Sequence, residues 1–293
     1  MADQVPPLVT TSWLSQHLGT KKKPLIVLDV TWNPRGKSGN DFHQEQHIPG
    51  SLYFNLEECK DHESPFKFTL PSPNDFDKYV SNLGISNQTH VVIYENDPRY
   101  KAKTSERVWW MFRYFGHDKV SVLDGGLEQW VKDGFSVTSD STEDPVKATF
   151  KSTVQRHLLK TYDEVLEDLK EGSVQLVDTR PSHWFDGSKP SLWPDLRLGT
   201  IHRAKHLTFE DCMAKDSTRF RTAAELREVF ASADIDLSKP VTTTCNVGVT
   251  ACIVAMAAFL QGKEDVAVFD GSWDEFSQRA PDDLLRINIY HKQ

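Results

Sequence analysis

Cysteine is scarce in this chain, with four residues in 293, and none of the four lies in a C-x-x-C pair. Long apolar runs are also missing. The longest candidate, residues 251–260, is about half of the roughly 18 residues that suggest a membrane span, and it fits a buried core helix. We therefore expect free thiols in a reducing compartment, no disulfide scaffold and no membrane partner.

Targeting signals and excess positive charge are absent as well. The first residues, MADQVPPLVTT, contain neither an apolar signal segment nor an Arg-rich presequence. We expect a soluble, cytoplasmic protein, with a mitochondrial location left open. The 34 Lys and Arg are outnumbered by 42 Asp and Glu, which gives a formal net charge of −8. That sign argues against a nucleic-acid partner.

What the chain does contain is an internal duplication. LIVLDVTW (25–32) resembles VQLVDTRP (174–181), and KVSVLDGGLEQWV (119–131) resembles DVAVFDGSWDEFS (265–277). Further matching blocks recur in the same order at nearly the same spacing. The repeat unit is about half the chain, far longer than the repeat of a solenoid or a propeller. The length also suits about two domains.

Short apolar strands alternate with amphipathic helices in each half. Thr161 with Glu164, and Thr222 with Glu225, are spaced as capping boxes at helix starts. This alternation predicts an α/β fold of two tandem domains, each a mostly parallel sheet with helices on both faces. We place the N-terminal domain at residues 1–140, a linker at 141–157 and the C-terminal domain at 158–293.

One cysteine lies where a parallel sheet usually binds ligands, at the carboxyl end of a strand. Cys245 directly follows VTTT and precedes an apolar helix that begins near Thr250. Gly248 gives the intervening loop the freedom to turn its amides toward the sulfur. Those amides and the helix N-terminus favour a thiolate nucleophile, whereas the alternative is a buried structural cysteine.

Two other site types are disfavoured. Phosphatases of the Cys-x5-Arg type need a guanidinium six residues after the cysteine, where this chain has Ala251. The histidine pairs His43/His47 and His202/His206 have a spacing of four but no helical pattern around them. We interpret them as surface or capping histidines and expect no metal site.

The loop CNVGVTA, the block DVAVFDGSWDEF and the tandem domains resemble the rhodanese superfamily of two-domain sulfurtransferases. HIPGSLYF, ESPF, THVVIYE, RVWWMFRYFGH and SVLDGGLEQW look most like the 3-mercaptopyruvate branch. The resemblance covers almost the whole chain and implies two rhodanese-like domains, of which only the C-terminal one has the catalytic cysteine. The corresponding place in the N-terminal copy falls near Tyr94 and Glu95.

The resemblance implies covalent sulfur transfer without a metal or organic cofactor. Cys245 would take sulfur from a small-molecule donor as a persulfide and pass it to a thiol, including a thioredoxin-like one, or to cyanide. The donors considered are 3-mercaptopyruvate, thiosulfate and organic persulfides. The loop amides would hold the negative charge of the persulfide. The loop residues are Asn246, Val247, Gly248, Val249 and Thr250.

The chain departs from the family pattern at several positions around the expected donor site. Thiosulfate-type enzymes follow the cysteine with Arg-Lys and mercaptopyruvate-type enzymes with Gly-Ser, whereas here Asn246 and Val247 follow. Two arginines that grip the carboxylate of the donor align with Trp184 and Trp193. The acid and the histidine that assist the serine align with Glu57, which retains the acid, and with Phe68, which lacks the imidazole.

The expected donor pocket therefore comprises Trp184, Trp193, Arg180, Arg197 and Glu57. Arg180 has two open interpretations, pairing with a carboxylate or catalysis. Arg197, Lys189 or Arg203 is close enough in sequence to replace the missing clamp. We expect weak handling of both small anions relative to donors with an apolar body. The alternative function is a weakened family member that serves as a persulfide carrier or a protein-interaction module.

Overall fold

The computed structural model describes residues 5–19, 24–33, 36–96, 104–191, 193, 195–215 and 218–286. Its contacts divide the chain into two compact units. Unit 1 comprises residues 1–61, 70–155 and 215–220, and unit 2 comprises residues 62–69, 156–214 and 221–293. The two units are not simply the two halves of the chain. Residues 62–69 from the first half belong to unit 2, and residues 215–220 from the second half belong to unit 1.

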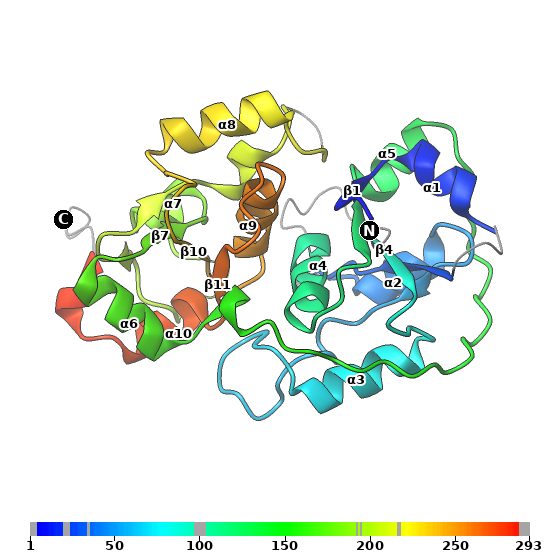
Figure 1. Cartoon of the computed structure of the whole chain (residues 1–293), viewed down its shortest axis with the longest axis horizontal. Coiled ribbons are helices and arrows are strands. Elements are labelled where there is room, and N and C mark those ends of the chain that lie inside the picture. The colour runs from blue at the N-terminus through cyan, green and yellow to red at the C-terminus, as the bar shows by residue number, and fades with distance from the viewer. Residues whose placement is uncertain are drawn as a thin grey trace. The chain divides into compact units, whose positions relative to one another are not determined.

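Unit 1 is built on a five-stranded parallel sheet in the order β1-β5-β4-β2-β3, and Figure 1 labels β1 and β4 of this sheet. Its strands are β1 (Leu8–Val9), β2 (Leu25–Asp29), β3 (Leu52–Tyr53), β4 (His90–Tyr94) and β5 (Val120–Leu123). Its helices are α1 (Thr11–His17), α2 (Gly39–Glu45), α3 (Pro73–Asn82), α4 (Ser105–Tyr114) and α5 (Gly126–Lys132).

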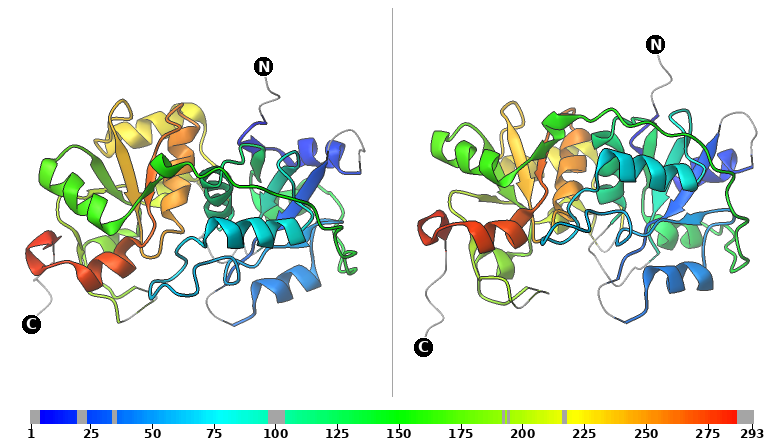
Figure 2. Two further views of the ribbon diagram at one scale, coloured as in Figure 1. Left: turned by 60° about the horizontal axis from the view of Figure 1, so that its bottom comes forward. Right: turned by 90° about the horizontal axis from the view of Figure 1, so that it is seen from below.

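Helices cover both faces of the unit 1 sheet. α1 and α5 pack on one face, where Leu14 and Leu127 join a buried apolar cluster with strand residues such as Val92. α3 and α4 lie on the other face, where the ring of Phe76 stacks on Phe115 with 4.0 Å between centroids. Figure 2 shows this layering from two further directions. The predicted fold class is thus present in this unit.

Unit 2 repeats the architecture with the sheet order β6-β11-β10-β7-β9, again with parallel neighbours. Its main strands are β6 (Leu159–Lys160), β7 (Gln175–Asp178), β9 (Lys205–His206), β10 (Val241–Thr244) and β11 (Ala267–Phe269). β8 (Thr200–Ile201) and β12 (Leu285–Arg286) form an antiparallel pair. The helices are α6 (Tyr162–Glu171), α7 (Ser182–Phe185), α8 (Ala223–Ser232), α9 (Ala251–Phe259) and α10 (Ser272–Arg279), with 3₁₀ turns η1 (Arg156–Leu158), η2 (Phe209–Cys212) and η3 (Asp282–Leu284).

Two helix layers also cover the unit 2 sheet. α6 and α10 lie on one face, and their Val165 and Phe276 pack in one cluster with Phe269 of β11. α8 and α9 lie on the opposite face (Figure 1). Residues 251–258 of α9 are all buried, as expected for the longest apolar run in the chain. No helix within the described residues is long and apolar enough to cross a membrane.

Local sequence signals explain where several helices begin. Thr161 caps α6 and Thr222 caps α8, and in each case the glutamate three residues later completes a capping box. Ser72 caps α3, with Pro73 in the first turn, where a missing N–H costs no hydrogen bond. These starts agree with the sequence predictions because a capping box involves residues only three positions apart.

The segment predicted as a linker has no helix or strand from residue 139 to residue 155. Its second half is nevertheless fixed on unit 1. The amide of Phe150 donates to Ser81 Oγ at 3.0 Å, and the amide of Ser152 donates to Asp77 Oδ1 at 2.9 Å. The Phe150 ring is buried edge-on against Phe76. Residues 148–155 therefore form part of the unit 1 structure.

Candidate active site

Cys245 lies at the carboxyl end of the middle strand of unit 2. β10 ends at Thr244, which is paired in register with Asp178 at the end of β7. The amide of Thr179 donates to Thr244 O at 2.8 Å, so these two strand ends are fixed side by side. The location predicted from the sequence for Cys245 is therefore the one in the structure.

The loop of residues 245–250, here called the Cys245 loop, turns back at Gly248. Gly248 has φ of +75°, a value that glycine adopts at little cost. Among the described residues, the amides of Asn246, Val247 and Val249 donate to no other backbone carbonyl. Thr250, the N-cap residue of α9, does not cap that helix with its own side chain, whereas Thr222 caps α8.

A serine that the sequence reading did not single out fixes the start of the Cys245 loop. The amide of Cys245 donates to Ser272 Oγ at 3.2 Å, and that hydroxyl donates to Phe269 O at 2.7 Å. The next amide, of Trp273, donates to Cys245 O at 3.0 Å. Ser272 is fully buried with φ of +50°, which is uncommon for a residue with a side chain. Its signal in the sequence was the repeated block that contains DGSW.

Asp274 makes the following contact with the Cys245 loop. Its amide donates to Asn246 O at 2.8 Å, and its fully buried carboxylate accepts a hydrogen bond from the amide of Lys67 at 2.9 Å. Lys67 belongs to the segment 62–69 of unit 2. Neither residue was expected at the site, because 207 positions separate them and sequence spacing does not show that they meet.

The other cysteines have surroundings that differ from those of Cys245. Burial raises the pKa of the Cys59 thiol and of the Cys212 thiol well above its usual value, so both stay protonated at neutral pH. Cys252 is buried inside α9, where its Sγ donates to Gly248 O at 3.3 Å. Its contact fits the structural role expected from the sequence.

Comparison with known proteins places this architecture in one family. The model of the rhodanese-like domain matches residues 10–133 and 161–279, one match in each repeat. Mouse thiosulfate sulfurtransferase is 46% identical over 280 residues, which cover 94% of this chain and 93% of the relative. Human 3-mercaptopyruvate sulfurtransferase is 36% identical over 283 residues, which cover 95% and 94%.

The chain belongs to the rhodanese family. Its fold is also similar to the crystal structure of SseA from Escherichia coli, described as a 3-mercaptopyruvate sulfotransferase, with a TM-score of 0.81 and 26% identity over 92% of this chain and 99% of that one. The chain is accordingly a sulfurtransferase and an enzyme. The recognition from the motifs is confirmed.

The order of identity among these relatives differs from the expectation from the motifs. The thiosulfate sulfurtransferase from mouse is 46% identical to this chain, whereas the mercaptopyruvate enzymes from human and mouse are 36% identical. The motifs that suggested the mercaptopyruvate branch cover only a few short blocks. Sequence identity over the whole chain also includes the positions outside these blocks.

Arg180 of the family pattern is bound to a carboxylate. Its Nε and Nη2 donate to the two carboxylate oxygens of Asp178 at 2.6 to 3.0 Å, and both side chains are buried. Nη2 also donates to Gly199 O at 2.8 Å, and the guanidinium lies 4.7 Å from the centroid of the Trp273 ring. Of the two interpretations left open, the structure favours carboxylate pairing.

The remaining residues of the expected donor pocket are in different surroundings. Trp184 is half-buried in the short helix α7, and Trp193 packs on the unit 2 core with the Lys67 ammonium 5.7 Å from its ring centroid. Arg197 is paired with Asp282 at 2.6 Å, and its own carbonyl accepts a hydrogen bond from Trp273. The structure therefore places the Lys67 ammonium beside Trp193 and pairs the Arg197 guanidinium with Asp282.

The two positions that align with the family acid and histidine fall in different units. Glu57 lies in unit 1, exposed, where Trp32 Nε1 donates to it at 2.9 Å and Lys60 pairs with it at 2.8 Å. Phe68 lies in the segment 62–69 of unit 2 and is buried with φ of +58°. A buried phenyl ring thus stands where the family pattern has an imidazole.

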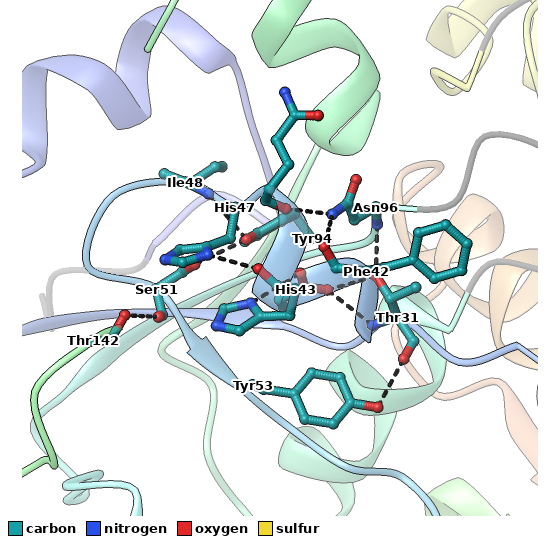
Figure 3. A network of polar contacts seen from close by, with 12 residues as sticks. Thr31, Phe42, His43, His47, Ile48, Ser51, Tyr53, Tyr94, Asn96 and Thr142 are labelled. Atoms are coloured by element: carbon teal, nitrogen blue, oxygen red, sulfur yellow. Dashed lines mark hydrogen bonds and ion pairs between the residues drawn. The ribbon is translucent and has the colours of Figure 1, made fainter. Parts of the chain in front are cut away.

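The histidine pair His43/His47 is not at the surface, which corrects the sequence interpretation. His43 lies in α2, and both rings are buried and stacked with 4.2 Å between centroids. His43 Nδ1 is 3.1 Å from Asp29 Oδ2, and His47 Nδ1 is 2.7 Å from His43 O (Figure 3). The two residues belong to a buried polar network at the end of β2, a long-range arrangement that sequence spacing does not reveal.

Proposed function

We propose that Cys245 is the nucleophile that accepts and donates the transferred sulfur. The observation that carries this proposal is the position of the Cys245 loop, at the carboxyl end of the middle strand and at the N-terminus of α9, which Thr250 does not cap with its side chain. A helix N-terminus and loop amides without a backbone acceptor can stabilise negative charge on sulfur. The pinned backbone of Cys245 supports the same role, because a nucleophile must be held in one orientation.

The proposed reaction has two steps and conserves electrons within each. The Cys245 thiolate attacks the outer sulfur of the donor, a new S–S bond forms, and the donor fragment leaves with the electron pair of the broken bond. An acceptor thiolate or cyanide then attacks the outer sulfur of the Cys245 persulfide and regenerates the thiolate. This sequence predicts ping-pong kinetics.

In place of the donors with an apolar body that the sequence favoured, we assign the preferred donor to the class of small anions that contain sulfane sulfur, as thiosulfate does. Sulfite leaves such a donor as a stable anion and needs no proton, whereas pyruvate leaves mercaptopyruvate as an enolate that must be protonated. Val247 is buried and has no hydroxyl to supply that proton. The 46% identity to a thiosulfate sulfurtransferase supports the same assignment.

We assign the acceptor to thiols, including the exposed thiol of a thioredoxin-like protein, or to cyanide. The Asn246 side chain supports the binding of a polar substrate, either the sulfur donor or the sulfur acceptor, close to Cys245. Its Oδ1 is buried and has no hydrogen-bond partner among the described residues. An O–H or N–H group of a bound molecule would satisfy it.

The test is to incubate the protein with thiosulfate and to locate the added sulfur by mass spectrometry of its peptides. We expect the mass of one sulfur atom on the peptide that contains Cys245. Cys245→Ser should lower transfer to cyanide at least about 1,000-fold, because the serine hydroxyl stays protonated.

Cys212→Ala provides the control, because the protonated Cys212 thiol lies in the same unit and outside the Cys245 loop. It should keep transfer within about twofold, since no step uses that thiol. Sulfur found on another cysteine, or substantial transfer by Cys245→Ser, would refute the assignment. A higher kcat/KM for mercaptopyruvate than for thiosulfate would refute the donor class.

A further inference from the structure

The segment 62–69 brings a cation to the Cys245 loop. It contains no helix or strand, and it is attached to α10 through the amide of Lys67, which donates to Asp274 Oδ2 at 2.9 Å. Phe68, the next residue, is buried with φ of +58°. The anchor is therefore made by the backbone, and a change of the Lys67 side chain leaves it intact.

Asp274 connects this anchor to the Cys245 loop. Its amide donates to Asn246 O at 2.8 Å, and Gln278 Nε2 donates to its Oδ1 at 2.9 Å. The carboxylate is fully buried. A buried negative charge on a residue that is hydrogen-bonded to the neighbour of Cys245 would repel an anionic donor unless a cation offsets it.

The Lys67 ammonium is that cation. Its Nζ is 3.5 Å from Asp274 Oδ2, which is a loose ion pair, and 5.7 Å from the centroid of the Trp193 ring. The side chain remains 41% exposed. An ammonium has three N–H donors, so one that is loosely paired and exposed keeps the capacity to bind a second anion.

We propose that Lys67 binds the anionic group of the sulfur donor and thereby determines donor specificity, with Trp193 beside it. This inference rests on the proposed function of Cys245. Asp274 acts as a positioning residue, because it fixes Lys67 next to Asn246. Arg197 does not take this role, since its guanidinium is engaged with Asp282. A lysine from a distant segment thus replaces the arginines that the family pattern places at Trp184 and Trp193.

The experiment separates the two half-reactions. Loading is measured as the rate at which thiosulfate adds sulfur to Cys245. Discharge is measured as the rate at which the loaded protein gives that sulfur to 2-mercaptoethanol, a neutral thiol. Lys67→Met should slow loading about 10- to 100-fold through a higher KM, because a charge-assisted contact is lost. Discharge should change less than about twofold, since 2-mercaptoethanol has no anionic group apart from the thiolate sulfur that reacts.

Two further variants and a salt series sharpen the test. Lys67→Arg should restore most of the loading rate, because it restores the positive charge. Lys160→Met is the matched control, since Lys160 is a partly exposed lysine of unit 2 paired with Asp168 at 2.8 Å. It should leave loading unchanged. Raising ionic strength should slow loading of the unmodified protein more than that of Lys67→Met.

The outcomes separate the inference from the proposed function. If thiosulfate loads Lys67→Met as fast as it loads the unmodified protein, the inference is overturned, while Cys245 remains the nucleophile. Equal slowing of loading and discharge would also overturn it, because that result indicates a structural role of the segment. Failure of the unmodified protein to load Cys245 at all would refute the proposed function, and the inference with it.

Discussion

The middle strands of the two units end at equivalent positions and are followed by different chemistry. β4 ends at Tyr94, paired with Asp29, and β10 ends at Thr244, paired with Asp178. The residue after Tyr94 is Glu95, the counterpart of Cys245. The amide of Leu127 donates to Glu95 O at 3.0 Å, just as the amide of Trp273 donates to Cys245 O.

The two helix N-termini that follow are used in opposite ways. In unit 1 the Glu95 carboxylate accepts hydrogen bonds from the amides of Thr104 and Ser105 at 3.0 and 3.4 Å and from Ser105 Oγ at 2.8 Å. A permanent side-chain anion therefore fills the N-terminus of α4. In unit 2 Cys245 takes the place of Glu95, and the N-cap residue Thr250 does not cap α9 with its own side chain. The comparison teaches that one architecture can hold a carboxylate at this helix N-terminus in one unit and a thiol before it in the other.

The strand-end aspartates show a second difference. Asp29 accepts from the amide of Thr31 at 3.0 Å and lies 3.1 Å from His43, whereas Asp178 accepts from the amide of Arg180 at 3.1 Å and pairs with its guanidinium. The turn is the same, but the side chain that contacts the aspartate is a histidine in one unit and an arginine in the other. Unit 2 thus contains a buried ion pair between Asp178 and Arg180.

The largest expected effect tests this ion pair. Arg180→Met leaves the Asp178 carboxylate buried without its guanidinium and should lower the unfolding free energy of unit 2 by about 3–5 kcal/mol. Urea unfolding, with hydrogen exchange of the β7 and β10 amides, measures the loss. The double change Asp178→Asn with Arg180→Met should recover part of it. A loss below about 1 kcal/mol would show that the pair is not a stability determinant.

The next largest effect is a loss of stability of unit 1 at acidic pH. Burial lowers the pKa of His117 from 6.5 to about 4, and its Nε2 lies 2.9 Å from Thr89 O. Below pH 6.5 the unfolded chain therefore binds a proton on His117 that the folded chain does not bind. The unfolding free energy is highest above pH 6.5 and decreases as the pH falls from 6.5 to about 4. We expect a loss of about 2 kcal/mol between pH 7 and pH 5 in urea unfolding.

His117→Gln supplies the control for that titration, because glutamine keeps an N–H donor and does not titrate. Its unfolding free energy should be lower than that of the unmodified protein at pH 7 and should change less between pH 7 and pH 5. An equal pH dependence in the two proteins would assign the loss to other groups.

A smaller effect tests the Glu95 carboxylate, which lies at the N-terminus of α4 in unit 1. Glu95→Ala removes the acceptor of three donors at α4 and should cost about 1–2 kcal/mol of unit 1 stability. Sulfur transfer should stay within about twofold, because Glu95 is not part of the proposed reaction. Glu95→Gln keeps one acceptor oxygen and should lose less. A loss of transfer larger than the loss of stability explains would contradict the separation of roles.

The smallest effect concerns Ser272. Ser272→Ala removes the acceptor for the Cys245 amide and should lower kcat about 3- to 10-fold, with little change in KM, because a neutral hydrogen bond contributes about 0.5–1.5 kcal/mol. Ser272→Gly should show the same kinetic loss but a higher unfolding free energy than Ser272→Ala, since glycine tolerates φ of +50°. Unchanged kcat in both variants would remove Ser272 from the site.

Several features of the fold and the site were predictable because they depend on neighbours in the sequence. The capping boxes at Thr161 and Thr222, the turn at Gly248 and the strand end before Cys245 all follow from patterns a few residues long. The duplication is visible in the sequence for the same reason. Parallel strands then place Cys245 at a ligand-binding edge.

The surroundings of Cys245 were less predictable, since they depend on residues far apart in the chain. The sequence placed Arg197 near the donor, but Asp282, which binds it, lies 85 positions away. It placed His43 and His47 at the surface, but both are buried, and His43 contacts Asp29 of β2 and Tyr53 of β3. Sequence spacing contains no information about such partners.

The sequence by itself determined the family, the two-fold repeat and the position of Cys245 in its loop. Tertiary structure alone decided that Lys67 meets Asp274, that Arg180 is held by Asp178 and that Ser272 pins Cys245. The physical reason is the range of the interactions. Helix caps and turns are hydrogen bonds within a few residues, whereas a buried charge selects its partner only after the sheet and its helices have brought distant segments together.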